Sequence, residues 1–526
     1  MWNEKSSQDQ SRALDIVLWI LGGLSLVFSL WVATVGWHNT IFDFHGFRQA
    51  QTAISAESIR NGGPILRYET PVFGPPWSLP FEFPLYQVLV ALLAKLFAAP
   101  IDKTGRFVSE IFHYLIFFPL ASILARLGLT RVQRIPTLAL FAASPFYNFI
   151  SHLFMIESTA LFLSLVFLDQ IFRLVQSQED DKRRRWYITG AASFGMLAGL
   201  VKVTTLAPFF VLASCLLLWH FWGEYKHGTL KTAPALIIGA VCLGLPIVVT
   251  ALWTKFADAL KSQNPLGIRE TSTALKQWNF GTLEQRIHPG NYFNFFYSVN
   301  TMVGSRWLAV FVLIVAFFLC RRWLWPAAVS IALYLIAIEI FFNLHFIHQY
   351  YAYANAIFIV IAIGIVLGGM VGLPGRTAWI GVLLLTVMLG ACVLRYKAEY
   401  YDLQHTNTLR RAQTAALVDR ITAPDDVILI TGLDWSAELP YQSHRRAIMA
   451  PTVPSLSPGL RQAIRNQGPD RIAAFVACAT GRTDPSLPEL LGQLGMPDTP
   501  TLYANDCDIY ERTVVRAITG TTPARD

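Results

Sequence analysis

The chain has 526 residues, of which 54% are apolar and 14% are charged, whereas about a quarter are charged in an ordinary soluble domain. With 36 Phe, 18 Tyr and 15 Trp it is no disordered chain, and it is too long for one soluble core, which stops growing at roughly 250–300 residues. We therefore interpret the net charge of +8 as a membrane-topology signal rather than as a nucleic-acid surface.

Long apolar runs predict about eleven membrane spans, because each is near the roughly 17–25 residues that cross a bilayer. The first run is too long for the core of a signal peptide, so we expect a retained anchor with a cytoplasmic N-terminus. The runs are residues 15–36, 107–125, 135–150, 156–175, 187–203, 205–222, 232–252, 305–320, 324–342, 352–372 and 377–394.

A twelfth apolar run, residues 85–99, is shorter and contains Lys95. If it crossed the membrane, the basic loops at 126–134 and 182–185 would both lie outside, against the positive-inside rule. We therefore expect this run to lie in the membrane interface. A first outer loop then spans residues 37–106, with surface helices at 47–59 and 84–97.

The composition changes after residue 395, and the predicted domains are a membrane part (1–395) and a small extracytoplasmic α/β domain (396–526). We expect an amphipathic helix over 395–420, a helix at 460–466, and strands at 427–431, 472–476 and 508–512. If this domain lies outside, Cys478 and Cys507 can form a disulfide, and the sequence favours neither state. Asp434 and Trp435 follow a strand end, where ligands often bind. They suit a contact with a glycan acceptor, or a lid packed on the membrane part.

Polar residues gather at the outer ends of the predicted spans. The first loop holds Asp43, His45, Arg48 and Glu82, and the span ends and outer turns add Glu157, Lys202, His348 and Tyr351. Each has a structural interpretation alone, since a helix N-terminus favours an acid and a lysine can snorkel. Ionisable groups at membrane depth are costly, so their convergence predicts a functional site.

Cations beside carboxylates at a lipid–water boundary suit a donor with an anionic phosphate head and an apolar tail. The cations would bind the phosphate, and a carboxylate would take a proton from an acceptor hydroxyl. No Walker or Rossmann motif indicates a nucleotide. The alternative is a transporter or flippase of an anionic lipid or solute, but the chain shows no internal repeat.

Several short patterns together resemble the GT-C glycosyltransferases, especially the bacterial family 39-type relatives of protein O-mannosyltransferases and lipid A aminoarabinose transferases. The resemblance covers residues 15–395. It departs at His45-Gly46, where the family has an acidic pair, and at Phe83, where it has a lysine. The matching patterns are Arg48 with its helix, Phe81-Glu82-Phe83-Pro84, Glu157, Leu200-Val201-Lys202 and His348-Gln349-Tyr350-Tyr351.

The resemblance implies a glycosyltransferase, for hexoses or pentoses, that uses a polyprenyl-phosphate-linked sugar on the outer face of the plasma (inner) membrane and inverts the anomeric centre. The acceptor would be a glycan, a lipid or a protein. Asp43, or else His45, would be the base; a divalent metal ion serves some family members and not others. The implied catalytic residues are Asp43, His45, Glu82 and Glu157, and the implied phosphate ligands are Arg48, Lys202, His348 and Tyr351.

Overall fold

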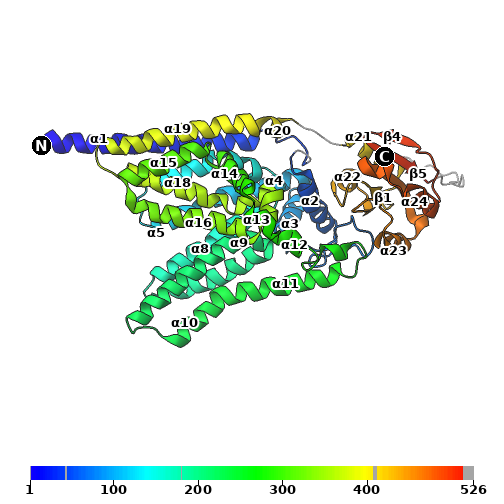
Figure 1. The fold of residues 1–526 in the computed structure, drawn as a ribbon, viewed down its shortest axis with the longest axis horizontal. Helices are drawn as coiled ribbons and strands as arrows, with labels where there is room; N and C mark the ends of the chain where they lie inside the picture. Colours follow the sequence, from blue (N-terminus) through cyan, green and yellow to red (C-terminus); the bar gives the residue numbers. More distant parts are fainter. Residues whose placement is uncertain (1, 42–43, 179–180, 407–410, 513–526) are drawn as a thin grey trace. The chain divides into compact units, whose positions relative to one another are not determined.

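The computed structural model describes residues 2–41, 44–178, 181–406 and 411–512. The chain divides into two compact units, which are described separately (Figure 1). The membrane unit comprises Met1–Tyr68, Pro80–Ala259 and Glu270–Thr408. The sheet unit comprises Glu69–Leu79, Leu260–Arg269 and Leu409–Asp526.

The membrane unit is built from helices. The longer ones are α1 (Trp2–Thr34), α2 (Gly46–Arg60), α3 (Leu85–Leu96), α4 (Ile101–Leu115), α5 (Phe117–Arg126), α8 (Glu157–Gln176), α9 (Arg184–Lys226), α11 (Leu245–Lys261), α14 (Pro289–Val303), α15 (Arg306–Leu319), α16 (Leu324–Ile340), α18 (Ala356–Val371) and α19 (Arg376–Glu399). The shorter ones are α6 (Ile135–Ala143), α7 (Pro145–Ser151), α10 (Thr232–Gly239), the π-helix η1 (Ala240–Gly244), α12 (Lys276–Phe280), α13 (Leu283–Ile287), the 3-10 helix η3 (Arg321–Trp323), α17 (Phe342–Ile347), the 3-10 helix η4 (Gln349–Ala354) and α20 (Tyr401–His405).

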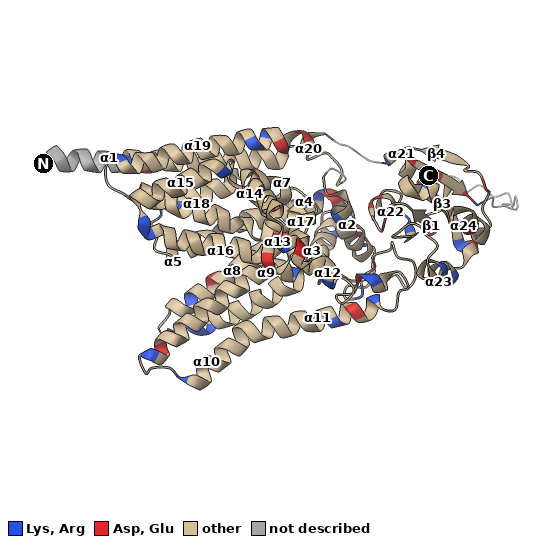
Figure 2. Ribbon diagram, in the orientation of Figure 1, with Lys and Arg blue, Asp and Glu red and all other residues tan. Residues whose placement is uncertain are grey.

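Apolar composition and length make this a multi-pass membrane fold. Among the described residues, seven helices are long and apolar enough to cross a bilayer, or eight if the bent pair α14–α15 is one span. Charged residues are sparse along these helices and gather near their ends (Figure 2). The expected surface segments at 47–59 and 84–97 are indeed helices, α2 and α3, and α3 has only 12 residues.

Helix α9 folds back on itself at Lys202. The backbone there leaves the helical region (φ −162°, ψ 95°) and divides α9 into two halves. Phe167 of α8 stacks with Phe210 at 6.4 Å and also lies beside Gly195. Gly195 and Phe210 are 15 positions apart in α9. A straight helix would separate them by about 22 Å. The halves therefore correspond to the two runs expected at 187–203 and 205–222, with Lys202 in the turn between them.

Helix α18 lies inside the membrane unit. Every residue from Ala356 to Val371 is buried, which explains why its sequence is apolar on all sides. Gly364 packs against Thr137 of α6 so closely that no side chain would fit. The segment η4, which precedes α18, is thereby held on a rigid support.

The sheet unit has five strands: β1 (Val427–Thr431), β2 (Arg446–Met449), β3 (Ile472–Cys478), β4 (Leu502–Ala504) and β5 (Cys507–Glu511). Their order is β2-β1-β3-β5-β4, with β1 parallel to β2 and β3, and β5 antiparallel to β3 and β4. Cys478 and Cys507 stand opposite each other and form a disulfide. The helices are α21 (Ala412–Ile421), α22 (Glu438–Gln442), α23 (Pro458–Gln467) and α24 (Leu487–Leu494), with 3-10 helices η5 (Pro469–Arg471) and η6 (Ala479–Thr483); η2 (Gly267–Glu270) ends at the unit boundary.

Two segments from earlier in the chain complete the sheet unit. Residues 71–74 pair with the edge of β2, since the amides of Ala447 and Met449 donate to the carbonyls of Pro71 and Val72 at 2.9 and 3.0 Å. Asn264 then donates to the carbonyls of Gly74 and Pro76 at 2.9 and 3.0 Å. The unit is therefore assembled from three separate stretches of sequence.

The sequence interpretation of the C-terminal part was incomplete. Strands at 427–431, 472–476 and 508–512 were expected and are observed to within two residues, but β2 and β4 were missed. The continuous helix expected over 395–420 is wrong, because α19 ends at Glu399 and two short helices follow. Tyr400 leaves helical geometry where Gln349 donates to its hydroxyl at 2.8 Å, so tertiary contacts override the local pattern.

Candidate functional site

The first half of the site comes from the outer-loop segment around α2. His45 precedes α2 in a left-handed conformation (φ 59°), and Arg48 follows within the first turn. The Arg48 guanidinium donates to Gln51 Oε1 at 2.8 Å and to Glu82 Oε1 at 3.2 Å. Gln87 of α3 donates to the same Glu82 oxygen at 3.1 Å. The two surface helices thus hold a guanidinium and a carboxylate side by side.

The second half of the site lies at the turn of α9. Lys202 Nζ donates to Glu157 Oε1 at 2.5 Å, and Glu157 is the first residue of α8. Leu200, two residues before the lysine, accepts a hydrogen bond from the amide of Phe83 at 3.1 Å. This bond connects the turn of α9 with the loop that carries Glu82.

Aromatic side chains of η4 join the two halves. Lys202 Nζ lies 4.3 Å from the ring centre of Tyr351 and 5.3 Å from that of Tyr350. The His45 ring meets Tyr350 edge-on at 5.0 Å, and His348 stacks on Tyr350 at 5.2 Å. Seven of the expected site residues therefore form one group, the polar cluster: His45, Arg48, Glu82, Glu157, Lys202, His348 and Tyr351.

The polar cluster is shielded from solvent. The side chains of Arg48, Glu82, Lys202 and Glu157 are exposed by 15%, 12%, 9% and 2%, so both ion pairs lie at low dielectric. Two acceptor atoms in this cluster have no hydrogen-bond partner among the described residues: Glu157 Oε2 and His45 Nε2. Buried polar atoms are normally satisfied by protein, by water or by a ligand, so these two atoms are available to bind one.

Burial also sets the charge of the loop residues. It lowers the pKa of His45 to about 3, with a smaller contribution from His348, so the imidazole is neutral at pH 7. Burial and the nearby Lys202 and Arg48 lower the pKa of His348 as well. Burial opposes the charge of Arg48, but the carboxylates of Glu82 and Glu157 more than offset this and raise its pKa. The polar cluster thus presents two cations balanced by two anions.

The remaining expected residues lie elsewhere. Asp43 falls outside the described residues. Asp434 and Trp435 belong to the sheet unit, where Asp434 Oδ1 accepts from Arg269 at 2.7 Å and Trp435 packs on Phe73 at 5.3 Å. Tyr350 contacts both His45 and Lys202, yet sequence reasoning assigned it no role of its own. The His-x-Tyr-Tyr pattern, in which Tyr350 stands beside Tyr351, could have identified Tyr350 as a site residue.

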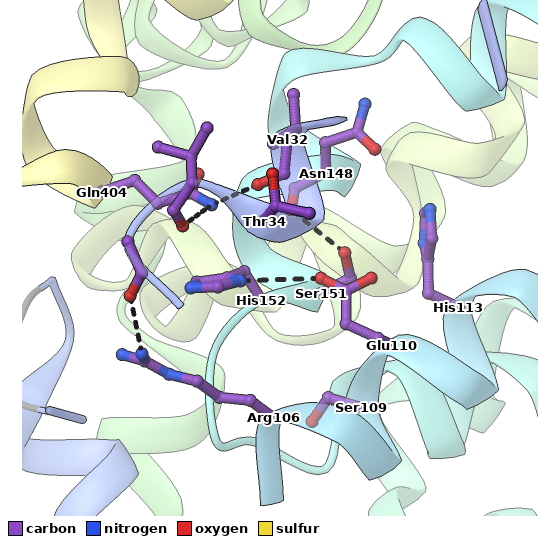
Figure 3. Close-up of polar contacts among 12 residues, drawn as sticks. Val32, Thr34, Arg106, Ser109, Glu110, His113, Asn148, Ser151, His152 and Gln404 are labelled. Atoms are coloured by element: carbon purple, nitrogen blue, oxygen red, sulfur yellow. Dashed lines mark hydrogen bonds and ion pairs between the residues drawn. The ribbon is translucent and has the colours of Figure 1, made fainter. Parts of the chain in front are cut away.

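Sequence reasoning also missed a buried polar group behind the start of the outer loop (Figure 3). Arg106 of α4 donates to the carbonyls of Asn39 and Thr40 at 2.8 and 2.6 Å. His152 Nδ1 lies 3.7 Å from Glu110 Oε1. The signal was present as an arginine and a glutamate four residues apart in an apolar helix. Arg106 thereby anchors the chain at Asn39 and Thr40, a few residues before His45.

The sheet unit has a hollow of its own, about 440 Å³ in volume. It lies where the parallel strands β1, β2 and β3 end, and ligands commonly bind at such carboxyl ends. Gly432 (φ +82°) packs against the carbonyl of Cys478, so no side chain would fit there. The polar lining is Asp434, Thr452, Thr480 and Thr483.

Two solved structures share the fold of the whole chain. ArnT from Cupriavidus metallidurans, bound to undecaprenyl phosphate, aligns with 94% of this chain and 97% of its own, with a TM-score of 0.62 and 14% identity. The oligosaccharyltransferase AglB from Archaeoglobus fulgidus, in complex with an inhibitory peptide and a dolichol-phosphate, aligns with 88% and 69%, with a TM-score of 0.55 and 10% identity. Both are GT-C glycosyltransferases.

The chain has the GT-C fold. The fold expected from the sequence resemblance is thereby confirmed. No protein-family model matches the chain, and no curated protein sequence matches it.

The described residues of the polar cluster form no obvious metal site. No group of three or more His, Cys, Asp or Glu side chains that could hold a metal ion is found among the described residues. Glu82 and Glu157 each use one carboxylate oxygen to bind a cationic side chain. An oligosaccharyltransferase from Archaeoglobus fulgidus has been crystallised with Zn and sulfate.

Proposed function

We propose that this GT-C chain is a membrane glycosyltransferase that moves a sugar from a polyprenyl-phosphate donor to an acceptor hydroxyl. The observation that carries the proposal is the polar cluster, in which two largely shielded cations stand beside two buried polar atoms without partners among the described residues. Cations suit the phosphate and acceptors suit sugar hydroxyls. ArnT bound to undecaprenyl phosphate and AglB with dolichol-phosphate support the same donor class.

Arg48 and Lys202 would bind the donor phosphate. As the anomeric C–O bond breaks, the bridging oxygen takes the electron pair and negative charge grows on the phosphate, where fixed cations stabilise it. Tyr351 and the neutral His348 would add hydrogen bonds to the phosphate without changing the charge balance. Glu82 keeps Arg48 oriented, and Glu157 Oε2 would accept from a sugar hydroxyl.

The acceptor hydroxyl would attack the anomeric carbon from the face opposite the phosphate, which inverts that centre. Its proton goes to a base, for which Asp43 is the first choice and His45 the rival. A carboxylate with an ordinary pKa of about 4 is ionised at pH 7. His45 is neutral, but burial lowers its pKa to about 3, so it accepts a proton less readily than an ordinary imidazole.

The reaction would take place on the extracytoplasmic face of the inner membrane. The disulfide between Cys478 and Cys507 supports an oxidising location for the sheet unit, since disulfides persist outside the cytosol. The hollow in that unit suits a glycan acceptor. Its polar lining offers threonine hydroxyls and the Asp434 carboxylate, which is paired with Arg269.

Binding of undecaprenyl phosphate to the purified protein, followed by native mass spectrometry, tests the phosphate site. Lys202→Gln and Arg48→Gln should each weaken binding about 10- to 150-fold, since a charge-assisted hydrogen bond contributes about 1.5–3 kcal/mol. Lys226→Gln is the matched control, because Lys226 lies exposed at the far end of α9. Equal affinity in all four proteins would contradict the proposal.

Surface glycans of a deletion strain test the transfer itself. Mass spectrometry should reveal one missing sugar, which the wild-type gene restores and the Lys202→Gln gene does not. Unchanged glycans in the deletion strain would contradict a transferase.

A further inference from the structure

An apolar cavity of about 340 Å³ lies between α14, α15, α16 and α18 in the membrane unit. Its walls are almost entirely hydrocarbon, with Val299, Ala309, Ile331 and Ile363 among them. Helices α14 and α15 meet at an angle of 84°, and residues of both line the cavity. Such a cavity accepts a hydrocarbon chain and offers little to a polar solute.

One cation stands in the wall of this cavity. Arg306 is the first residue of α15, and its guanidinium lies 4.9, 5.3 and 5.5 Å from the ring centres of Tyr297, Phe296 and Trp307. Its Nε is buried without a hydrogen-bond partner, and among the described residues no carboxylate forms an ion pair with it. Glu339 of α16 instead accepts from the Tyr292 hydroxyl at 2.6 Å.

This cavity is separate from the polar cluster. Ile359 and Ile363 of α18 line the cavity, whereas Phe358 packs on Phe209 of α9 at 4.9 Å. Helix α18 therefore stands between the cavity and the helix that carries Lys202. A ligand in the cavity would not be the donor whose phosphate sits on Lys202.

We propose that the cavity binds one hydrocarbon chain of an anionic phospholipid, with the lipid phosphate on Arg306. The pairing of an apolar wall with one uncompensated cation at a helix end matches an amphiphile with an anionic head. A zwitterionic lipid would bring its own cation close to Arg306 and bind less well. Free phosphate would contact only Arg306 and would leave the apolar cavity empty.

Native mass spectrometry of the whole protein, titrated with phosphatidylglycerol or with phosphatidylcholine of the same chains, tests the proposal. We expect one phosphatidylglycerol to bind at least 10-fold more tightly than phosphatidylcholine. Arg306→Gln should abolish that preference. Val310→Phe, which fills the cavity but keeps the charge, should weaken both lipids. Arg321→Gln, at the other end of α15, and Lys202→Gln should leave the preference unchanged.

The proposal would be overturned by no preference between the two lipids, by a preference that survives Arg306→Gln, or by affinity unchanged by Val310→Phe. Competition with undecaprenyl phosphate shows whether the cavity binds a phospholipid or the lipid of the donor. If undecaprenyl phosphate displaces phosphatidylglycerol in a way that needs Arg306, the cavity belongs to the donor and the proposal fails. The effect of Lys202→Gln on undecaprenyl phosphate binding tests the donor site of the proposed function independently. Thermal unfolding confirms that each variant is folded.

Discussion

His45 stands where the GT-C pattern described above has an acidic residue. Because His45 is buried, the pH dependence of activity cannot identify the base. A histidine with the usual pKa near 6.5 would make activity rise between pH 6 and 8. With a pKa of about 3 the His45 imidazole is already neutral throughout that window, so activity stays flat whether His45 or a carboxylate takes the proton. The base must therefore be found by substitution.

Asp43→Asn should reduce transfer by about 10²–10⁴-fold, the usual contribution of a general base, while His45→Ala should reduce it only a few-fold. Initial rates with the wild-type protein should be level from pH 6 to 8. His38→Ala is the control, since His38 is an exposed histidine of the same loop. Retained activity in Asp43→Asn together with an inactive His45→Ala would identify the histidine as the base.

The ion pair of Arg48 and Glu82 should contribute to stability as well as to binding. Glu82→Gln leaves the largely shielded Arg48 without its ion-pair partner, which should cost more than breaking an exposed pair but less than the about 3–5 kcal/mol of a fully buried one. Thermal unfolding in detergent should show a clear decrease in Tm. Glu399→Gln, which breaks the more exposed pair with Arg395, should cost less than about 1 kcal/mol. Equal shifts in Tm would contradict this burial.

At the scale of the elements, the fold of α9 decides where Lys202 lies. A straight helix would separate residues 185 and 226 by about 60 Å. With the turn at Lys202, spin labels at Arg185→Cys and Lys226→Cys should be within about 30 Å, because packed helices lie 8–10 Å apart. Pulsed electron resonance in nanodiscs measures this distance. The pair Val203→Cys and Lys226→Cys lies within one half and should give about 35 Å in either geometry.

The sequence predicted the helices and the members of the site better than their contacts. Apolar runs indicate spans directly, and the ends of those runs carry Glu157, Lys202 and the aromatic residues that the structure brings together. The edge strand β2 was not predicted because its four residues are too few to show an alternation of apolar and polar side chains. The association of residues 71–74 with β2 could not be foreseen either, since it depends on a partner more than 370 positions away.

At the scale of the whole molecule, eleven spans and the orientation of the loops stay predictions. With Cys215 replaced by Ser, an impermeant thiol reagent should label Asn61→Cys and Asp498→Cys in intact cells, and Gln178→Cys only after permeabilisation. All three positions are exposed. External labelling at Gln178 would mean that Leu85–Leu96 crosses the membrane, and the polar cluster could not lie on the outer face.

The insertion of residues 71–74 into the sheet unit has a consequence for the order of synthesis. Residue 79 is made 367 residues before Arg446 begins β2. At about 5–20 residues per second, the buried side chains of Val72, Phe73 and Leu79 must wait roughly 20–70 s for the strand that covers them. During that interval the nascent chain exposes an apolar strand edge, so newly made protein should depend on a chaperone on that side of the membrane far more than the finished protein does.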